Sequence, residues 1–416
     1  MINIRLSNKP LILRIIIVIF SLAIILLTVR SLFQIITTLA PDFSVFWTST
    51  HDLINYRNPY TNPTLFTINA YPPSTFIYFI PLALIPYKVA QGIFVILSFL
   101  TIPGIVLVSL KTLSKKVNLY QFLLFLSLVL ISFPTKFTLG MGQVNLVAFL
   151  ILLSSFYFYK EEKPEMSGIF LGAACLLKPA LGFILLLFVL KRKWKVILYS
   201  FLVPALATIL IASGFGINPF VYWVKEIIPQ LSGIIGREVY YNQGIMGFIS
   251  RLTPNLTTRV YLNTAISIVL ILFTSFFTLK VKKNENLQFA LFVTALLLVD
   301  TLSWQHHFVW LIFPFILLAE YASRVKKTWF WVLLFLAYLL VSWNFKTPQA
   351  FSVFPTSLVL SNTHYGAIIV YLLTFWVYIP LETTWEKLKI QGKLDQLKRK
   401  GSNWLELLSL QPPPGS

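Results

Sequence analysis

A polar segment between two long apolar stretches holds the side chains best suited to acid–base chemistry. It covers residues 41–73, and its ionisable side chains include Asp42, His51, Asp52 and Arg57. A carboxylate just outside the hydrocarbon stays ionised at little cost and can still reach a substrate carried by a lipid. Such a carboxylate can act as a general base that removes the proton of a hydroxyl. We interpret Asp42 as the chemical centre and Asp52 as an ordinary surface acid.

A second ionisable side chain lies inside an apolar stretch. Lys178 stands in the sequence Leu177-Lys178-Pro179, near the middle of residues 167–190. A cation at that depth costs roughly 2.5–3.5 kcal/mol on insertion scales, so it is normally paired or faces a polar cavity. We favour a phosphate as its partner, because the two charges compensate each other. The alternative is that Lys178 reaches the membrane surface or pairs with an internal acid such as Glu320.

The composition of the whole chain is that of a polytopic membrane protein. Of its 416 residues, 57% are hydrophobic and 12% charged, and the mean hydropathy is +0.78. The net charge of +20 comes from short basic clusters between apolar segments, which is typical of topology signals and not of nucleic-acid binding. A single cysteine excludes a disulfide framework, and four histidines leave little room for metal chemistry.

The apolar segments predict an all-α protein of the membrane. Several are shorter than the roughly 20 residues of a full span, so we expect tilted or shallow helices. The prediction is about 10 spanning helices plus a broken half-helix pair. The first segment is too long for a cleavable signal, so we expect an uncleaved helix. The segments lie near 11–38, 76–110, 119–134, 144–159, 167–190, 196–213, 260–279, 287–302, 307–320, 328–343 and 365–383.

The basic clusters predict the topology, because Lys and Arg gather on the cytoplasmic side. Simple alternation satisfies this rule except at 167–190, where both flanks are basic. Pro179 breaks the helix there, and two half-helices that dip in and out keep both flanks inside. Both termini are then cytoplasmic, residues 1–385 form the transmembrane catalytic domain, and 386–416 form a basic tail. The clusters are Arg5/Lys9, Lys111/Lys115/Lys116, Lys160/Lys163, Lys191–Lys195, Lys280/Lys282/Lys283, Arg324/Lys326/Lys327 and Lys387–Lys400.

Three further polar segments fall in loops that this topology places outside, on the side of Asp42. They are residues 140–145, 237–243 and 300–307. Acids, imidazoles, amides and cations that converge at one interface favour a site for a polar group.

Simpler roles are open for each of these residues. Asp42 could cap a helix, and the pair His306 and His307 could be satisfied by headgroups or water at the membrane surface. Trp304 fits an aromatic belt, and Gly142 could simply permit close helix packing. The basic tail could lie on an anionic inner leaflet as an amphipathic helix, or be solvated.

Six motifs, in order over most of residues 30–320, resemble those of glycosyltransferase family 87. This family comprises membrane mannosyltransferases of the GT-C fold that use polyprenyl-phosphate-mannose. The motifs are Asp42-Phe-x-Val-Phe-Trp47 with Asn58-Pro59-Tyr60, Tyr71-Pro72-Pro73, Gly142-Gln143-x-Asn145, Leu177-Lys178-Pro179 with Lys191-Arg192-Lys193-Trp194, Asn242-Gln243-Gly244, and Ser303-Trp304-x-His306-His307.

The resemblance implies an inverting transfer of a hexose, by family habit mannose, from a polyprenyl-phosphate donor to a hydroxyl on the extracytoplasmic face of the plasma membrane. It implies that Asp42 is the general base and that His306 and His307 hold acceptor or phosphate. Many relatives carry an acid directly before this pair, where the chain has Gln305. The acceptor therefore stays open among glycolipid, glycoprotein and cell-wall polymer.

Other side chains complete the predicted site. The first loop lacks an Asp-x-Asp or Glu-x-Asp pair, so we predict catalysis without a metal, with cations in its place. The candidate phosphate-binding cations are Lys178, Arg237 and Arg251. The candidate substrate-binding residues are Tyr71, Gln143, Asn145, Asn242, Gln243 and Trp304.

Two other functions compete with this interpretation. A lipid-linked-sugar flippase or secondary transporter would explain the broken helix with its lysine, but it predicts inverted repeats and charges spread to both faces. A polymer ligase or aminosugar transferase would concentrate its polar residues in one large late loop, whereas here the first loop carries the acid.

Overall fold

The computed structural model describes residues 4–5, 11–114, 117–232, 240–280, 284–325, 327–351 and 353–377. This part is almost entirely helical, and its one sheet is a two-residue parallel pairing of β1 (Ile4–Arg5) with β2 (Val117–Asn118). The predicted all-α class is therefore confirmed for these residues. Arg237 and the predicted tail at 386–416 lie outside them.

Within the described residues, six helices are long and apolar enough to span a membrane. Several of them turn apolar side chains outward, such as Leu11 on the first and Leu272 on the fourth, and hydrocarbon solvates such surfaces without cost. This pattern is that of a multi-pass membrane protein. The six are α1 (Leu11–Thr37), α4 (Tyr87–Leu113), α10 (Trp194–Phe215), α14 (Leu256–Lys280), the continuous η4 (Gln305–Leu311) and α16 (Ile312–Val325), and the helical segment Thr356–Val377, which begins with η6 (Thr356–Ser361).

Further apolar helices are bent or short. The helices α5 (Leu119–Ile131) and α6 (Phe133–Met141) meet at 62° and could count as a seventh span. The predicted count of about ten spans therefore stays a prediction. The shorter apolar helices are α7 (Asn145–Lys160), α8 (Pro164–Leu177), the pair η2 (Pro179–Ile184) and α9 (Leu185–Leu190), α15 (Glu285–Val299) and α17 (Thr328–Ser342).

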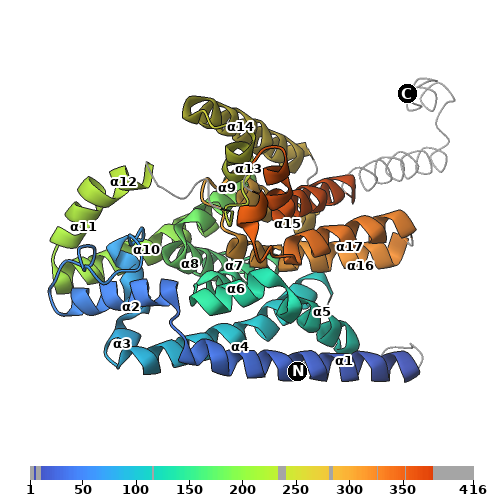
Figure 1. Ribbon diagram of the computed structural model, residues 1–416, viewed down its shortest axis with the longest axis horizontal. Helices are drawn as coiled ribbons and strands as arrows, with labels where there is room; N and C mark the ends of the chain where they lie inside the picture. Colours follow the sequence, from blue (N-terminus) through green and yellow to red (C-terminus); the bar gives the residue numbers. More distant parts are fainter. Residues whose placement is uncertain are drawn as a thin grey trace, which may run out of the picture.

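The remaining helices connect these apolar ones. They are α2 (Pro41–Ile54), η1 (Pro73–Tyr78), α3 (Ile80–Ala83), α11 (Asn218–Tyr222), the π-helical η3 (Trp223–Ile227), α12 (Ile228–Ser232), α13 (Ile245–Leu252) and η5 (Pro348–Phe351). In Figure 1, α2 lies beside α3 and α4, and α1 runs next to α4 along one side of the molecule.

The predicted break at Lys178 is confirmed. Helix α8 ends at Leu177, Lys178 has an extended backbone with φ −142° and ψ 94°, and Pro179 begins η2. Proline cannot donate a backbone hydrogen bond, and it forces the residue before it out of the helical region. The chain thus interrupts the helix where its lysine stands.

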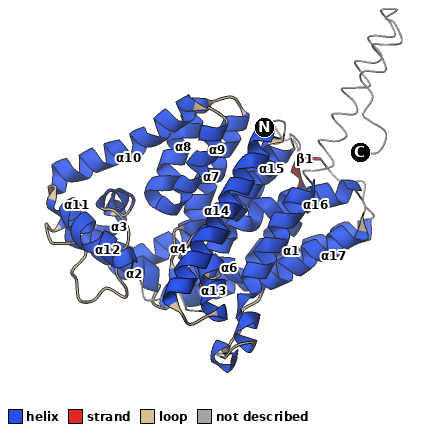
Figure 2. Cartoon of the chain, turned by 90° about the horizontal axis from the view of Figure 1, so that it is seen from above, coloured by secondary structure: helices blue, strands red, loops and turns tan. Residues whose placement is uncertain are grey.

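Close packing fixes this interruption in place. A Cβ added at Gly168 would lie 2.5 Å from the carbonyl oxygen of Val196, and Gly172 meets the backbone of Ser200 equally closely. Small residues of this kind let two membrane helices approach, and α7, α8 and α10 accordingly lie side by side in Figure 2. Helix α15 is buried on every side from Leu287 to Leu298 and forms part of the core.

Some loops that the charge pattern groups together contact each other. At one end, Lys160 Nζ contacts Asn286 Oδ1 at 3.3 Å and Lys191 Nζ contacts Glu285 Oε1 at 2.9 Å. At the other end, the loops that lack basic clusters meet each other, for example through the Tyr240 hydroxyl, which accepts the backbone N–H of Phe345. Which end faces the cytoplasm stays a prediction.

Candidate active site

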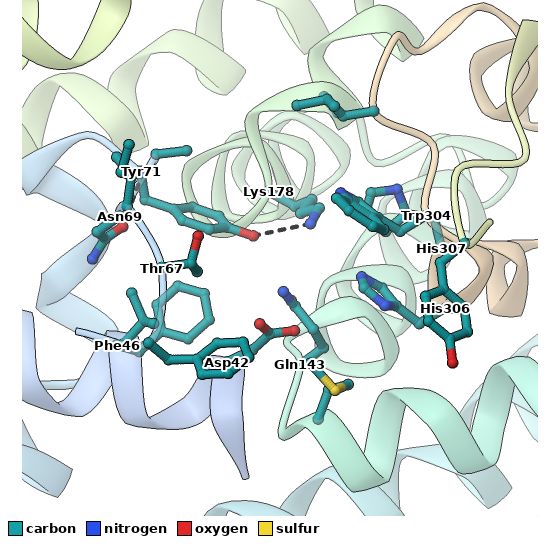
Figure 3. Close-up of a pocket in the computed structure, with 18 of the residues that line it drawn as sticks. Asp42, Phe46, Thr67, Asn69, Tyr71, Gln143, Lys178, Trp304, His306 and His307 are labelled. Atoms are coloured by element: carbon teal, nitrogen blue, oxygen red, sulfur yellow. Dashed lines mark hydrogen bonds between the residues drawn. The ribbon is translucent and has the colours of Figure 1, made fainter. Parts of the chain in front are cut away.

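A cavity of about 690 Å³ lies where six separate segments of the chain meet. Figure 3 shows polar side chains that point into it from opposite walls. Most of the predicted catalytic and binding residues are in its lining. The polar and aromatic lining residues are Asp42, Phe46, Phe66, Thr67, Asn69, Tyr71, Phe137, Gln143, Lys178, Tyr241, Asp300, Trp304, His306 and His307.

Asp42 stands in the first turn of α2, directly after Pro41. Proline suits the first helical position because its missing N–H is not needed there, and the helix N-terminus favours a negative charge. Burial raises the pKa of the carboxyl from 3.8 to about 6, although a hydrogen bond with the Gln143 side chain and the charge of Lys178 lower it in part. A carboxylate with this pKa is a competent base near neutral pH.

Gly142 brings Gln143 to this carboxylate. Its φ of +67° ends α6 in the left-handed conformation, which glycine adopts without strain. A Cβ at this position would lie 2.6 Å from Phe43 Cβ and 2.9 Å from Ala40 Cβ, which leaves no room for one. The proposed role of Gly142 in close helix packing is therefore confirmed, and the packing serves the site.

Lys178 faces the cavity and not an internal acid. Its Nζ donates to the Tyr71 hydroxyl at 2.9 Å and lies 5.5 Å from the centre of that ring, and the side chain is 8% exposed. Within the described residues no carboxylate lies within 4.0 Å of it. The alternative partner Glu320 instead accepts a hydrogen bond from Gln121 at 2.9 Å. Lys178 thus presents a largely desolvated cation to the cavity.

The histidine pair lines the wall shown at the right of Figure 3. Thr138 Oγ1 donates to the backbone oxygen of His306 at 3.0 Å, and the ring of His307 stacks on Trp310 with centroids 5.4 Å apart. Both rings are buried, yet none of their four nitrogens has a hydrogen-bond partner in the described part of the chain. Buried polar atoms without partners are rare, so these nitrogens are available to a ligand.

Asp300 is a lining residue that the sequence analysis did not single out. Its Oδ1 accepts the backbone N–H of Leu302 at 3.1 Å, and its Oδ2 lies 3.9 Å from His307 Nδ1. Burial raises the pKa of this carboxyl, and the Leu302 hydrogen bond and Lys178 counteract that effect. The available signal was an acid directly after a mostly apolar helix.

Two predicted substrate-binding amides hold the loops in place instead. Asn242 Nδ2 donates to the Thr301 carbonyl at 2.9 Å, and Asn242 pairs with Trp304 in an antiparallel bridge. Gln243 Nε2 donates to the Leu360 carbonyl at 2.8 Å, and its backbone N–H donates to Ser303. Neither residue lines the cavity. In this structure Asn242 and Gln243 therefore do not face the cavity. They hold in place the segment that carries Trp304 and the histidines.

Arg251 and Asn145 also lie outside the lining. The Arg251 guanidinium donates to the carbonyls of Tyr240 and Asn242 at 2.8 Å each, and burial lowers its pKa to about 10. Arg251 is thus engaged with the backbone and does not present its charge to a phosphate in the cavity. Asn145 is fully buried at the start of α7, where its carbonyl accepts the indole N–H of Trp310.

The interpretation of Asp52 as a surface acid is wrong. The residue is 2% exposed, and both of its oxygens are used: one lies 2.7 Å from Arg57 Nη2 and the other 2.6 Å from Asn62 Nδ2. These contacts close the loop after α2, away from the cavity. The loop itself supplies Thr67 and Asn69 to the lining, where Asn69 Oδ1 accepts the N–H of Tyr71. No sequence signal marked these two residues.

The described residues contain no group of three or more His, Cys, Asp or Glu side chains that could hold a metal ion. The cavity does contain two carboxylates, Asp42 and Asp300, so metal-independent catalysis stays a prediction. What the arrangement provides is a base with a raised pKa, a desolvated cation on another wall, and two imidazoles without partners. These groups can take a proton from a hydroxyl and bind an anion at the same time.

Comparison with known proteins places the chain in a family. Residues 69–302, more than half of the chain, match the sequence profile of Glycosyltransferase family 87. The match includes Tyr71, Gln143 and Lys178, whereas Asp42 and the histidine pair flank it.

Two curated relatives carry the same name, polyprenol-phosphate-mannose-dependent alpha-(1-2)-phosphatidylinositol mannoside mannosyltransferase. The protein from Mycolicibacterium smegmatis is 25% identical over 223 residues, 51% of this chain and 49% of the relative. The protein from Mycobacterium tuberculosis is 27% identical over 184 residues, 43% of this chain and 42% of the relative. The chain thus matches about half of the length of these relatives, and by its profile match it belongs to glycosyltransferase family 87.

Proposed function

We propose that this protein is an integral membrane glycosyltransferase that moves mannose from a polyprenyl-phosphate donor to an acceptor hydroxyl. The observation that carries the proposal is that Asp42 and Lys178 line the same cavity without being paired to each other. An acid and a cation that neutralised one another would form a structural ion pair. Here each of them is left to meet a different part of a substrate.

The proposed reaction is a single displacement. The acceptor hydroxyl oxygen forms a bond to the anomeric carbon, the bond between that carbon and the phosphate oxygen breaks, and the polyprenyl phosphate leaves with the electron pair. The hydroxyl proton passes to Asp42. Attack opposite to the leaving group inverts the anomeric configuration. General base catalysis of this kind contributes roughly 10²–10⁴-fold in rate.

Lys178 and Tyr71 are the proposed phosphate contacts. Lys178 is 8% exposed, its hydrogen bond goes to a neutral hydroxyl, and no carboxylate of the described residues lies within 4.0 Å to compete with an anion for it. Charge-assisted hydrogen bonds to phosphate are roughly twice as strong as neutral ones, and they strengthen in a cavity that excludes water. Lys178 thereby takes the role that a divalent ion has in other transferases. Arg237 remains a second candidate.

The relatives' names and the location of the cavity support the proposed substrates. The relatives are named for polyprenol-phosphate-mannose and for a phosphatidylinositol mannoside. We propose the same donor and a glycolipid acceptor for this chain. We also propose that the cavity opens on the extracytoplasmic face of the plasma membrane, because the loops that line it lack basic clusters.

The test is mannose transfer from polyprenyl-phosphate-mannose to phosphatidylinositol mannosides, with native protein and Asp42→Asn at equal expression in membranes. We expect product with native protein and a loss of at least about 100-fold in the variant. A parallel reaction with a chelator should proceed unchanged if no metal takes part. Absence of product with native protein would remove the proposal and favour the flippase alternative, which translocation of labelled donor across vesicles would then detect.

A further inference from the structure

Asp300 is held rigidly beside His307, in a way that the reaction proposed above does not require. Its Oδ1 accepts the Leu302 N–H at 3.1 Å, and Gly244 packs so closely on its backbone that a Cβ there would lie 2.6 Å from the Asp300 carbonyl oxygen. Asn242 anchors the next residue through the Thr301 carbonyl. One carboxylate oxygen is thus engaged, and the other, Oδ2, lies 3.9 Å from His307 Nδ1.

The ring of His307 has little freedom to turn away from this oxygen. It stacks on Trp310 at an interplanar angle of 5° and meets His306 edge-on, with centroids 4.8 Å apart. Neither of its nitrogens has another hydrogen-bond partner among the described residues. Hydrogen bonds of catalytic groups are often long without substrate and shorten when it binds, so a small adjustment would join Asp300 to Nδ1.

The hydrogen bond at one nitrogen of a histidine determines what the other nitrogen does. An ionised carboxylate accepts and cannot donate, so it selects the tautomer with the proton on Nδ1. The Nε2 lone pair is then left to accept a hydrogen bond. We propose that Asp300 is a positioning residue that holds His307 in this tautomer, so that Nε2 accepts a hydrogen bond from a sugar hydroxyl. This inference rests on the proposed function.

The charges around the cavity favour a hydroxyl over a phosphate at this position. The Asp300 carboxylate lies next to the imidazole and repels an anion, whereas Lys178 on another wall attracts one. Trp304 lines the cavity beside the histidines (Figure 3) and offers an apolar surface to the ring carbons of a sugar. The hydroxyl can come from the donor mannose or from the acceptor glycan.

The experiment compares native protein with Asp300→Asn, His307→Gln and the double variant in the mannose-transfer assay. The matched control is Thr301→Ala, because that neighbouring side chain is exposed. An asparagine amide donates to Nδ1 and so imposes the opposite tautomer, as in the Asp-to-Asn change of a serine-protease triad. We expect kcat/KM to fall roughly 10²-fold in Asp300→Asn and the double variant to be no worse than His307→Gln. Asp300→Glu, which keeps the carboxylate, should recover part of the rate.

Two further readouts identify the ligand. The first is the KM of each substrate in Asp300→Asn. A higher KM for the donor shows that the donor mannose supplies the hydroxyl, and a higher KM for the acceptor shows that the acceptor glycan does. Inhibition by polyprenyl phosphate without a sugar should be unchanged in Asp300→Asn and weakened in Lys178→Gln.

Three results would overturn the inference. The first is a native rate in Asp300→Asn, and the second is a double variant whose loss of rate equals the product of the losses in Asp300→Asn and His307→Gln. The third is inhibition by polyprenyl phosphate that weakens in Asp300→Asn as much as in Lys178→Gln. The melting temperature in detergent identifies a variant that fails to fold, and Asp300→Glu then decides by the same criteria. If native protein transfers nothing, the proposed function falls and this inference with it. If native protein transfers and Asp42→Asn does not, a normal Asp300→Asn removes this inference alone.

Discussion

Helix α2 carries two acids, Asp42 and Asp52, whose surroundings in the fold differ. Asp52, near its C-terminal end, has a cation and an amide bound to its two oxygens. Asp42, in its first turn, has a hydrogen bond with Gln143 and no cation within 4.0 Å in the described residues, although Lys178 lines the same cavity. Asp52 is buried and Asp42 is half-buried, but only Asp52 has partners within the protein at both carboxylate oxygens.

We propose that this difference distinguishes a structural acid, Asp52, from a reactive one, Asp42. A buried carboxylate with an ion pair is stabilised in its charged form and has nothing left to offer a substrate. The pKa of Asp42 is raised because burial removes water from its carboxylate, and the hydrogen bond with Gln143 and the charge of Lys178 offset that loss only in part. Keeping the carboxylate charged therefore costs the folded state free energy. An acid that the fold leaves incompletely paired, in a cavity, is a candidate base.

The largest expected effect is that of Asp42→Asn. Transfer activity should fall roughly 10²–10⁴-fold, because the amide keeps the shape but cannot take a proton. The melting temperature in detergent should stay the same or rise, since the variant removes a carboxylate whose charged form is disfavoured by burial. A variant that loses activity and stability together would show that Asp42 is structural. The proposed difference between Asp42 and Asp52 would then be wrong.

Lys178→Gln tests whether the cation acts on both the donor and the base. Losing a charge-assisted contact to phosphate should lower kcat/KM by about 10–100-fold. The base works only when deprotonated, so native activity should be lost as pH falls through about 6. Lys178 lowers the pKa of Asp42, and without it the acid limb of the kcat/KM profile should move to higher pH. A limb that stays in place would mean that another group titrates.

Asp52→Asn should show the reverse of the Asp42 result. Removing the charge weakens the bonds to Arg57 and Asn62, and hydrogen bonds to charged groups contribute about 1.5–3 kcal/mol. Because the Arg57 side chain is 60% exposed, solvent screens that pair, and we expect about 1–2 kcal/mol. The melting temperature should fall while kcat per folded molecule stays within about twofold of native. A normal melting temperature with lost activity would reverse the assignment of the two acids.

The sequence predicted this contrast only in part. Hydropathy and basic clusters indicated an all-α membrane protein, and Pro179 marked the helix break, because both signals are local. The identity of Asp42, Lys178 and the histidine pair as cavity residues agrees with their motifs. Whether an acid is paired in the fold depends on which residues the tertiary structure brings next to it. Arg57 and Asn62 follow Asp52 closely, but nothing in their spacing showed that they would bury it.

Motif membership also did not distinguish an amide that lines the cavity from one that holds the backbone. Gln143 and Gln243 both stand in Gly- and Asn-containing motifs, yet the first lines the cavity and the second spans three backbone segments. The polar segment 300–307 was recognised, but its motif did not show that Asp300 lines the cavity. The position of Asp300 depends on the pairing of the segment around Asn242 with the segment around Trp304, which is a tertiary contact between residues far apart in the sequence.

The last prediction concerns the geometry that brings Gln143 to Asp42. Gly142→Ala places a Cβ 2.6 Å from Phe43 and forces a left-handed conformation on a residue that disfavours it by about 1–2 kcal/mol. We expect a lower melting temperature and a loss of kcat of a few-fold, because α2 must shift away from α6. Gly140→Ala is the matched control, since an added Cβ there meets nothing within 4 Å. It should keep native activity and stability. Equal effects of the two alanines would mean that the α2–α6 contact does not set the position of the base, and that Asp42 owes its pKa to burial alone.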